Sequence, residues 1–256
     1  MPANLIAIVL ALFGAGAPGG AAPPPAPAPT AKPAAAPTGK PAPAPAGARD
    51  AERIVDAVQK FYQDTPQFSA KFRQTVLSGT FGKTTLSDGQ VYLKKPGKMR
   101  WDYVSKRNKS ITRSQMSDGN TIWVVLVQNK QYFEQSLTNS ALPVAVTFLT
   151  GKGNLKLDFN VALDSTGKFG SKTDRVLHLT PKKPSAQFKD LYLIVDPENY
   201  RVKQSVVINS GGDVNKFEFF EPDTAKRVAD TWFVFNPKAP AAKGFRRIEP
   251  PKEGAQ

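Results

Sequence analysis

The sequence predicts a mainly β domain in which about eleven short strands form a sequential antiparallel sheet, curled into a sandwich or a barrel. From Phe68 onward, apolar and polar residues alternate with a period of two, which places the apolar side chains on one face of each strand. Turn-forming residues separate these runs, as in Asp196-Pro197-Glu198-Asn199. Two further segments, near residues 51–62 and 141–149, have the helical period instead.

Two segments of different composition precede this domain. Residues 1–22 contain the apolar run ANLIAIVLALF, which fits a secretory signal peptide. Residues 23–48 are rich in proline and alanine and contain almost no large apolar side chain, so we expect a disordered, extended linker. The folded domain is then expected over residues 49–245, and a disordered tail over residues 246–256.

The domain is expected to begin with an amphipathic helix over residues 51–62. Pro66 disfavours a helical residue before it, so the helix should end near Asp64. The strands expected after it are residues 68–73, 91–94, 99–103, 117–127, 130–135, 155–163, 175–181, 188–196, 200–208, 214–221 and 231–237.

One segment among the strands is predicted to be an apolar helix. In LTNSALPVAVTFLTGKG, residues 137–153, apolar residues recur near helical spacing and glycine follows the last of them. Ser140 is a candidate cap, and Pro143 suits the first turn. A helix that is apolar nearly all round must cover an apolar surface.

Composition argues against catalysis and against metal binding. The chain has no cysteine, which excludes disulfides, thiolate catalysis and cysteine-ligated metals. The single histidine, His178, has no serine in a glycine elbow nearby and no second histidine to share a metal. We therefore predict no enzyme activity, no cofactor and no metal. The alternative is a cell-envelope enzyme acting on glycan, which needs two carboxylates that converge in the fold.

The net charge of +14 allows a nucleic-acid partner, but the pattern of VYLKKPGKMRWDY, residues 91–103, argues against one. Met99, Trp101 and Tyr103 share one strand face, and the charged residues share the other. The rings are therefore expected to point into an interior and not onto a stacking surface.

That interior can be filled in two ways. Eleven strands with 16 Phe, 6 Tyr and 3 Trp enclose more space than an eight-stranded barrel, which side chains just fill. Either the helices at residues 51–62 and 141–149 plug it permanently, or it is hollow with a movable plug and admits a hydrophobic ligand. Both versions fit the pattern.

The chain also resembles the LolA family of periplasmic lipoprotein carriers. The resemblance lies in GQVYLKKPGKMRWDY, SDGNTIWVV, QYFEQ, LPVAVTFLTGKGNLKLDFNV and LYLIVDPENYRVKQSVVINSGGDVNKFEF, and it covers residues 51–237. It implies a curved, unclosed antiparallel barrel with a helical lid that encloses an apolar cavity.

The resemblance implies a monomeric periplasmic chaperone that binds the acyl chains of lipoproteins. Its partners would be lipoproteins, an inner-membrane lipoprotein-releasing ABC transporter, and an outer-membrane receptor or the outer membrane itself. The alternative within this fold is a sensor or receptor domain that binds lipid or lipoprotein without carrying it. No nucleic-acid partner is expected.

The resemblance also implies roles for single residues. Lys95 stands where the family has an arginine that holds the lid by hydrogen bonds, and lysine replaces that planar fork with a point donor. Pro96 and Met99 are expected at the rim that meets the transporter. The residues expected to line the acyl cavity and its lid are Phe68, Phe72, Leu93, Trp101, Trp123, Leu142, Val146, Phe148 and Leu149.

Overall fold

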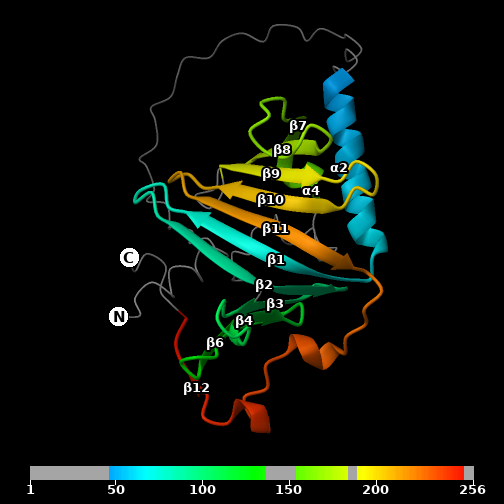
Figure 1. Ribbon diagram of the computed structural model, residues 1–256. Coiled ribbons are helices and arrows are strands. Elements are labelled where there is room, and N and C mark those ends of the chain that lie inside the picture. Colours follow the sequence, from blue (N-terminus) through cyan, green and yellow to red (C-terminus); the bar gives the residue numbers. More distant parts are fainter. Residues whose placement is uncertain (1–45, 137–153, 184–188, 251–256) are drawn as a thin grey trace, which may run out of the picture.

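The structure is a computed structural model that describes residues 46–136, 154–183 and 189–250 of the 256-residue chain. Its core is one twelve-stranded sheet with the order β12-β6-β5-β4-β3-β2-β1-β11-β10-β9-β8-β7 (Figure 1). The strands are β1 (Gln67–Leu77), β2 (Thr84–Lys94), β3 (Lys98–Val104), β4 (Ile111–Ser117), β5 (Thr121–Leu126), β6 (Gln131–Ser136), β7 (Phe159–Leu163), β8 (Arg175–Pro181), β9 (Asp190–Val195), β10 (Val202–Ile208), β11 (Val214–Asp223) and β12 (Arg246–Arg247).

The sheet does not close into a barrel, because β7 and β12 lie at its two ends and do not pair with each other. Neighbouring strands are antiparallel, except that β12 runs parallel to β6. The first strand pairs with both β2 and β11, so β1 joins the N-terminal and C-terminal halves of the sheet. The prediction of a mainly β, unclosed antiparallel sheet is confirmed.

One face of the sheet, called here the inner face, packs with helix α2 (Ala46–Asp64) in a single apolar cluster. The helical stripe predicted from the sequence is present, and Ala51, Ile54, Val55, Val58 and Tyr62 are buried. The helix lies against β7, β8 and the one-turn helix α4 (Leu155–Asp158) (Figure 1). An ion pair between Lys156 and Asp56, 2.6 Å long, joins α4 to α2.

The opposite face, the outer face, is partly covered by residues 224–248, called here the C-terminal clasp. The clasp contains the short 3₁₀ helices η3 (Asp230–Phe233) and η4 (Pro240–Ala242) and ends in β12. Phe235 and Phe245 pack against Met116, Trp123, Val125 and Tyr132 of the sheet. In Figure 1 the clasp runs from β11 to the edge at β6.

The clasp corrects two expectations. The strand expected over residues 231–237 is instead η3 followed by an irregular segment. The tail expected from residue 246 begins with a strand, because the Arg246 N–H donates to the Lys130 carbonyl and the Ile248 N–H donates to the Tyr132 carbonyl. At the other end, α2 begins before Arg49, where the domain was expected to start.

Two other differences are small. The strand expected over residues 155–163 divides into α4 and β7, and Asn154 caps α4 by accepting a hydrogen bond from the Lys156 N–H. The expected apolar helix at 141–149, the signal peptide and most of the linker lie outside the described residues. Within the described residues no helix is long and apolar enough to cross a membrane.

Candidate ligand-binding face

The inner face is a mainly apolar surface built by alternate residues of most strands. Its centre is aromatic: the Phe72 ring lies 5.1 Å from Trp101, 5.0 Å from Tyr103 and 5.8 Å from Phe217, measured between ring centroids. Leucine and valine from β8, β9 and β10 continue it on one side, and Ile122, Val124 and Leu126 of β5 continue it on the other.

Four of the residues predicted to contact acyl chains meet on this face. Phe68 and Phe72 come from β1, Leu93 from β2 and Trp101 from β3, and all are buried in the cluster that includes α2. Register explains the meeting, since Leu93 stands opposite Phe68 across the β1–β2 pair. The predicted lid residues Leu142, Val146, Phe148 and Leu149 lie outside the described residues.

Trp123, in contrast, lies on the outer face. Its indole N–H donates to the Glu134 carboxylate at 3.0 Å, and its ring belongs to the cluster that the C-terminal clasp covers. The reason is parity, because Ile122, Val124 and Leu126 take the inner positions of β5 and Trp123 falls between them. The expectation that Trp123 lines the same surface as Trp101 is wrong.

The two residues expected at the rim differ in exposure. Pro96 is exposed in the turn between β2 and β3. Met99 is only 2% exposed and packs in the inner cluster. Met99 is therefore a core residue in this conformation, and of the two only Pro96 is exposed.

Lys95 connects the β2–β3 turn to the end of α2. Its ammonium group donates a hydrogen bond to the backbone carbonyl of Gln63, in the last turn of the helix. Burial lowers the pKa of Lys95, and the nearby Asp64 carboxylate opposes that shift. Because carbonyl groups at a helix C-terminus lack partners within the helix, a cation there both satisfies one of them and stabilises the helix dipole.

A second contact fixes the same end of α2 to the other half of the sheet. The Val202 N–H, at the start of β10, donates to the Tyr62 hydroxyl oxygen at 3.3 Å. Burial raises the pKa of Tyr62, so the hydroxyl stays neutral at ordinary pH. The end of α2 is thus held from both sides, by Lys95 and by β10.

Sequence reasoning missed a group of polar residues on the inner face. Arg113 and Gln115 of β4 stand opposite Tyr103 and Trp101 of β3, and both are buried. Their segment, ITRSQMS, was not predicted to be a strand. In this segment Arg113 and Gln115 occupy alternate positions and would form a polar stripe, which ordinarily indicates the solvent-facing side of a strand.

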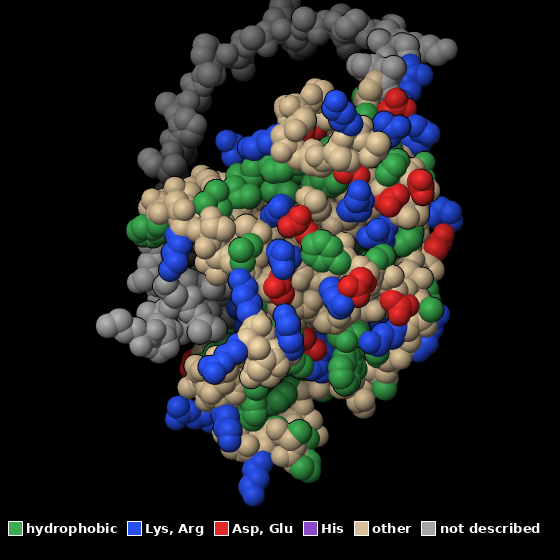
Figure 2. Space-filling model, viewed as in Figure 1, with side chains coloured by type: hydrophobic (Ala, Val, Ile, Leu, Met, Phe, Trp, Pro, Cys, Tyr) green, Lys and Arg blue, Asp and Glu red, His purple; other side chains and the backbone are tan. Residues whose placement is uncertain are grey.

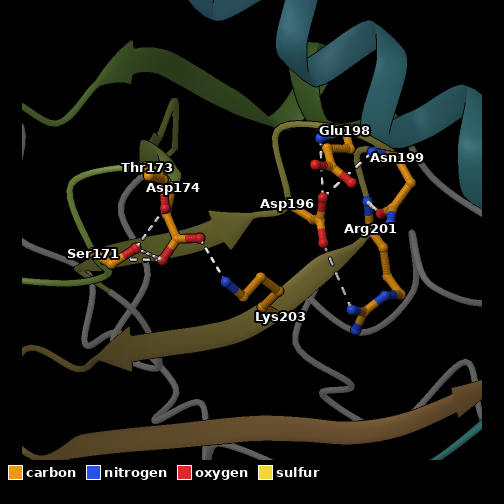
Figure 3. A network of polar contacts seen from close by, with 8 residues as sticks. All are labelled: Ser171, Thr173, Asp174, Asp196, Glu198, Asn199, Arg201 and Lys203. Atoms are coloured by element: carbon orange, nitrogen blue, oxygen red, sulfur yellow. Dashed lines mark hydrogen bonds and ion pairs between the residues drawn. The ribbon is translucent and has the colours of Figure 1, made fainter.

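A cavity among the described residues lies on the outer face, away from these groups. It has a volume of about 720 Å³, and loop 164–174 forms one of its walls. Asp174 bonds Lys203 at 2.7 Å and accepts from Ser171 at 2.9 Å, while Asp196, Asn199 and Arg201 form the neighbouring turn (Figure 3). Its lining is mixed: Thr75, Leu77, Thr84, Lys168, Phe169, Gly170, Ser171, Asp174, Lys203, Gln204, Val206, Val214 and Lys216.

In VYLKKPGKMRWDY the strand residues Lys94, Lys98 and Arg100 face outward, and the clasp contacts them. Asp230 of η3 pairs with Lys94 at 2.6 Å and with Lys98 at 2.5 Å. The Arg100 guanidinium lies 4.4 Å from the centroid of the Trp232 ring. On the face seen in Figure 2, lysine and arginine are scattered among acidic residues and do not gather in one patch.

Two carboxylates of β2 and β3, Asp88 and Asp102, have structural partners. Asp102 bonds Arg100 at 2.8 Å and accepts from Ser114 at 2.5 Å, and Asp88 bonds Arg73 at 2.7 Å. His178 bonds Asp190 at 2.7 Å and stacks on Tyr192. Across the described residues, no group of three or more His, Cys, Asp or Glu side chains is placed to hold a metal ion.

Comparison with known proteins identifies the family. The family model described as outer membrane lipoprotein carrier protein LolA matches residues 63–236. The chain belongs to the LolA family. The match runs from the last turn of α2 to the middle of the C-terminal clasp, so it includes the whole inner face of the sheet but not η4 or β12.

LolA relatives cover most of the folded chain at low identity. An outer-membrane lipoprotein carrier protein of Dechloromonas aromatica is 24% identical over 73% of this chain and 85% of its own length. One from Methylococcus capsulatus is 24% identical over 75% of this chain and 88% of its own. One from Methylobacillus flagellatus is 33% identical, but over only 27% of this chain and 32% of its own.

The solved structures that match this chain include a LolA superfamily protein of Nitrosomonas europaea. That match has a TM-score of 0.41 and 13% identity, and it covers 72% of this chain and 97% of that one. A conserved protein from Thermus thermophilus has a TM-score of 0.49 and 12% identity over 78% of this chain and 98% of that one.

Proposed function

We propose that this protein is a periplasmic chaperone that binds the acyl chains of lipoproteins and carries them from the inner to the outer membrane, without catalysis. The observation that carries the proposal is the apolar inner face centred on Phe72 and Trp101, in a chain of the LolA family. Relatives of 24% identity along most of the chain are named lipoprotein carriers.

The free energy available on this face suits a carrier. Each methylene of an acyl chain kept out of water contributes about 0.8 kcal/mol, so ten methylenes contribute on the order of 8 kcal/mol. In the unloaded protein, α2 already covers part of the inner face with Ile54, Val55 and Val58. Because cargo must compete with such side chains, its net affinity stays moderate and release remains feasible.

Lys95 is proposed to hold the closed form. Its bond to the Gln63 carbonyl joins the β2–β3 turn to the end of α2, so separating helix from turn breaks that bond. The hydrogen bond from a single lysine ammonium group is easier to break than a bidentate arginine contact. The exposed Pro96 in the same turn is proposed to contact the lipoprotein-releasing ABC transporter.

The test is release of lipoprotein from spheroplasts or from vesicles that contain the ABC transporter. The purified protein should release lipoprotein into the supernatant as a one-to-one complex, and the complex should then transfer it to outer-membrane vesicles. A known carrier of the family serves as the positive control. Release without transfer would favour a receptor or sensor role, and no release while the control succeeds would reject the proposal.

A further inference from the structure

We propose that Arg113 and Gln115 form a head-group site on the inner face, which binds an acyl ligand through an anionic oxygen group such as a carboxylate or a phosphate. The inference rests on the proposed function only in placing an acyl chain on this face. It adds that an acyl ligand with a free anionic end lies in a preferred direction on this face, with that end at β4.

The register of the sheet places both side chains on the inner face. Arg113 stands opposite Tyr103 on one side and Leu126 on the other, and Gln115 stands opposite Trp101 and Val124. Directly opposed residues of antiparallel strands project to the same face. All four of these neighbours belong to the apolar cluster that includes α2.

Both polar side chains are almost fully buried without their expected partners. Arg113 is 3% exposed and Gln115 is 2% exposed. The Arg113 Nε and the Gln115 Nε2 have no hydrogen-bond acceptor, and no carboxylate of the described residues is paired with Arg113. A buried guanidinium without a counter-charge is costly, and such groups are ordinarily paired.

The surrounding groups offset only part of that cost. The Arg113 Cζ lies 3.8 Å from the centroid of the Tyr103 ring, where the aromatic face attracts the cation. The Tyr103 hydroxyl is also buried, and its O–H has no acceptor among the described residues. Burial raises the pKa of Tyr103 to about 12, so near neutral pH its hydroxyl is protonated and able to donate.

The three unpaired groups are all donors: a guanidinium N–H, an amide NH₂ and a phenol O–H. Three donors around one cation select an acceptor with several oxygen lone pairs, and a carboxylate or phosphate matches the guanidinium fork. A neutral alcohol would accept fewer of these bonds and leave the charge uncompensated. Beside the donors, Trp101, Val124 and Leu126 offer apolar surface for the attached chain.

Titration calorimetry of the full-length protein with three twelve-carbon ligands tests the site. The ligands are dodecanoate, dodecyl phosphate and dodecanol, which share a chain and differ only in the head group. Wild-type protein should bind the two anions about tenfold or more tightly than the alcohol. The stronger of the two anions identifies whether the site prefers a free fatty acid or a phosphate such as that of a phospholipid.

Arg113→Met keeps an unbranched apolar side chain that corresponds to the arginine stem, and it removes the charge. We expect it to lose that preference while its affinity for dodecanol stays within about twofold of wild type. Arg73→Met is the matched control, because Arg73 lies on the outer face of β1 and pairs with Asp88. It removes the same charge without touching the inner face and should leave all three affinities unchanged.

A retained preference for the anions in Arg113→Met, or an equal loss in Arg73→Met, would overturn the head-group site. If Arg113→Met does not fold, Gln115→Leu is measured instead and should reduce the preference by several-fold. Dodecanol separates the two proposals: if wild-type protein binds it as tightly as the anions, the head-group site fails and acyl binding stands. Wild-type protein that binds none of the ligands contradicts both.

Discussion

At the centre of the inner face, the ring of Phe72 lies over the backbone of Gly89 on the neighbouring strand. A Cβ atom added to Gly89 would come within 2.5 Å of the Phe72 ring and 2.2 Å of the Asp102 carbonyl oxygen. The ring is enclosed by Trp101, Tyr103 and Phe217 and the carbonyl is part of a paired strand, so neither can move freely. Glycine is thus required here by a close approach.

Gly89→Ala should therefore lower the free energy of unfolding by roughly 1 to 3 kcal/mol, the usual range for overpacking a core. Urea unfolding followed by tryptophan fluorescence measures the change. Gly47→Ala is the matched control, because a Cβ atom there meets nothing within 4 Å and alanine favours the helical conformation. Equal stability of the two variants would contradict the close-approach explanation.

Lys95 gives a second prediction at the residue scale. Lys95→Met removes the donor to the Gln63 carbonyl while keeping an unbranched side chain of similar length. Amide hydrogen exchange in the last turn of α2 should become faster by a few-fold, since a single net hydrogen bond contributes about 1 kcal/mol. A fluorescent acyl probe should also bind faster. Lys95→Arg retains a donor, so its exchange and binding should remain close to wild type. Unchanged exchange in Lys95→Met would show that Lys95 does not stabilise the end of α2.

Single residues also show where sequence patterns stop being informative. Phe72, Leu93 and Trp101 were predicted on one surface because polar residues alternate with them, and they meet there. From Ile122 to Val127 every residue is apolar, so no alternating polar residue marks which positions face outward. Trp123 was therefore assigned to the wrong face. The inner-face position of Arg113 was missed for the opposite reason. A charged residue in a sequence ordinarily indicates an exposed position, so the sequence gives no sign that this one is buried.

Among the elements, the C-terminal clasp departs most from its predicted form. Its aromatic run, TWFVFNP, is typical of a strand, yet Phe233 is buried in η3 and Phe235 packs on Tyr132. The clasp is held to β2 and β3 by Asp230, whose pKa is lowered to about 2 by hydrogen bonds and charge from Lys94 and Lys98. These partners are far apart in the sequence, so no local pattern could indicate the contact.

The pH dependence of the clasp follows from that shift. The folded-state pKa of Asp230 lies below its unfolded value, so its contribution is fully present above about pH 4 and is lost as the pH falls toward 2. Limited proteolysis with pepsin should cut residues 224–248 increasingly over this window. Asp230→Asn should already be cut faster at pH 4, where Glu198→Gln, a charge change in the exposed β9–β10 turn, should behave as wild type. Equal cutting of both variants would show that the ion pairs do not hold the clasp.

At the scale of the whole molecule, the pairing of β1 with β11 determines which residues form the inner face and which form the outer face. The sequence predicts the strands and their turns, but the join between the first and last long strands depends on residues about 150 positions apart. That join makes one inner face from both halves of the chain, with α2 fixed to each half near its C-terminal end. The same sheet leaves a mixed polar cavity of about 720 Å³ on the outer face.

Because the two faces carry different tryptophans, quenching of tryptophan fluorescence can show on which face an acyl chain binds. Of the three in the chain, Trp101 lies on the inner face, Trp123 on the outer face, and Trp232 in the clasp. Variants that retain one tryptophan each, with phenylalanine at the other two positions, are titrated with a fatty acid that carries a nitroxide on its chain. A nitroxide quenches only rings close to it, so the chain should quench Trp101 strongly and the other two weakly. Fatty acid without the nitroxide is the control for conformational effects on fluorescence. Stronger quenching of Trp123 or Trp232 than of Trp101 would move acyl binding to the outer face and contradict the carrier proposal as it is drawn from this fold.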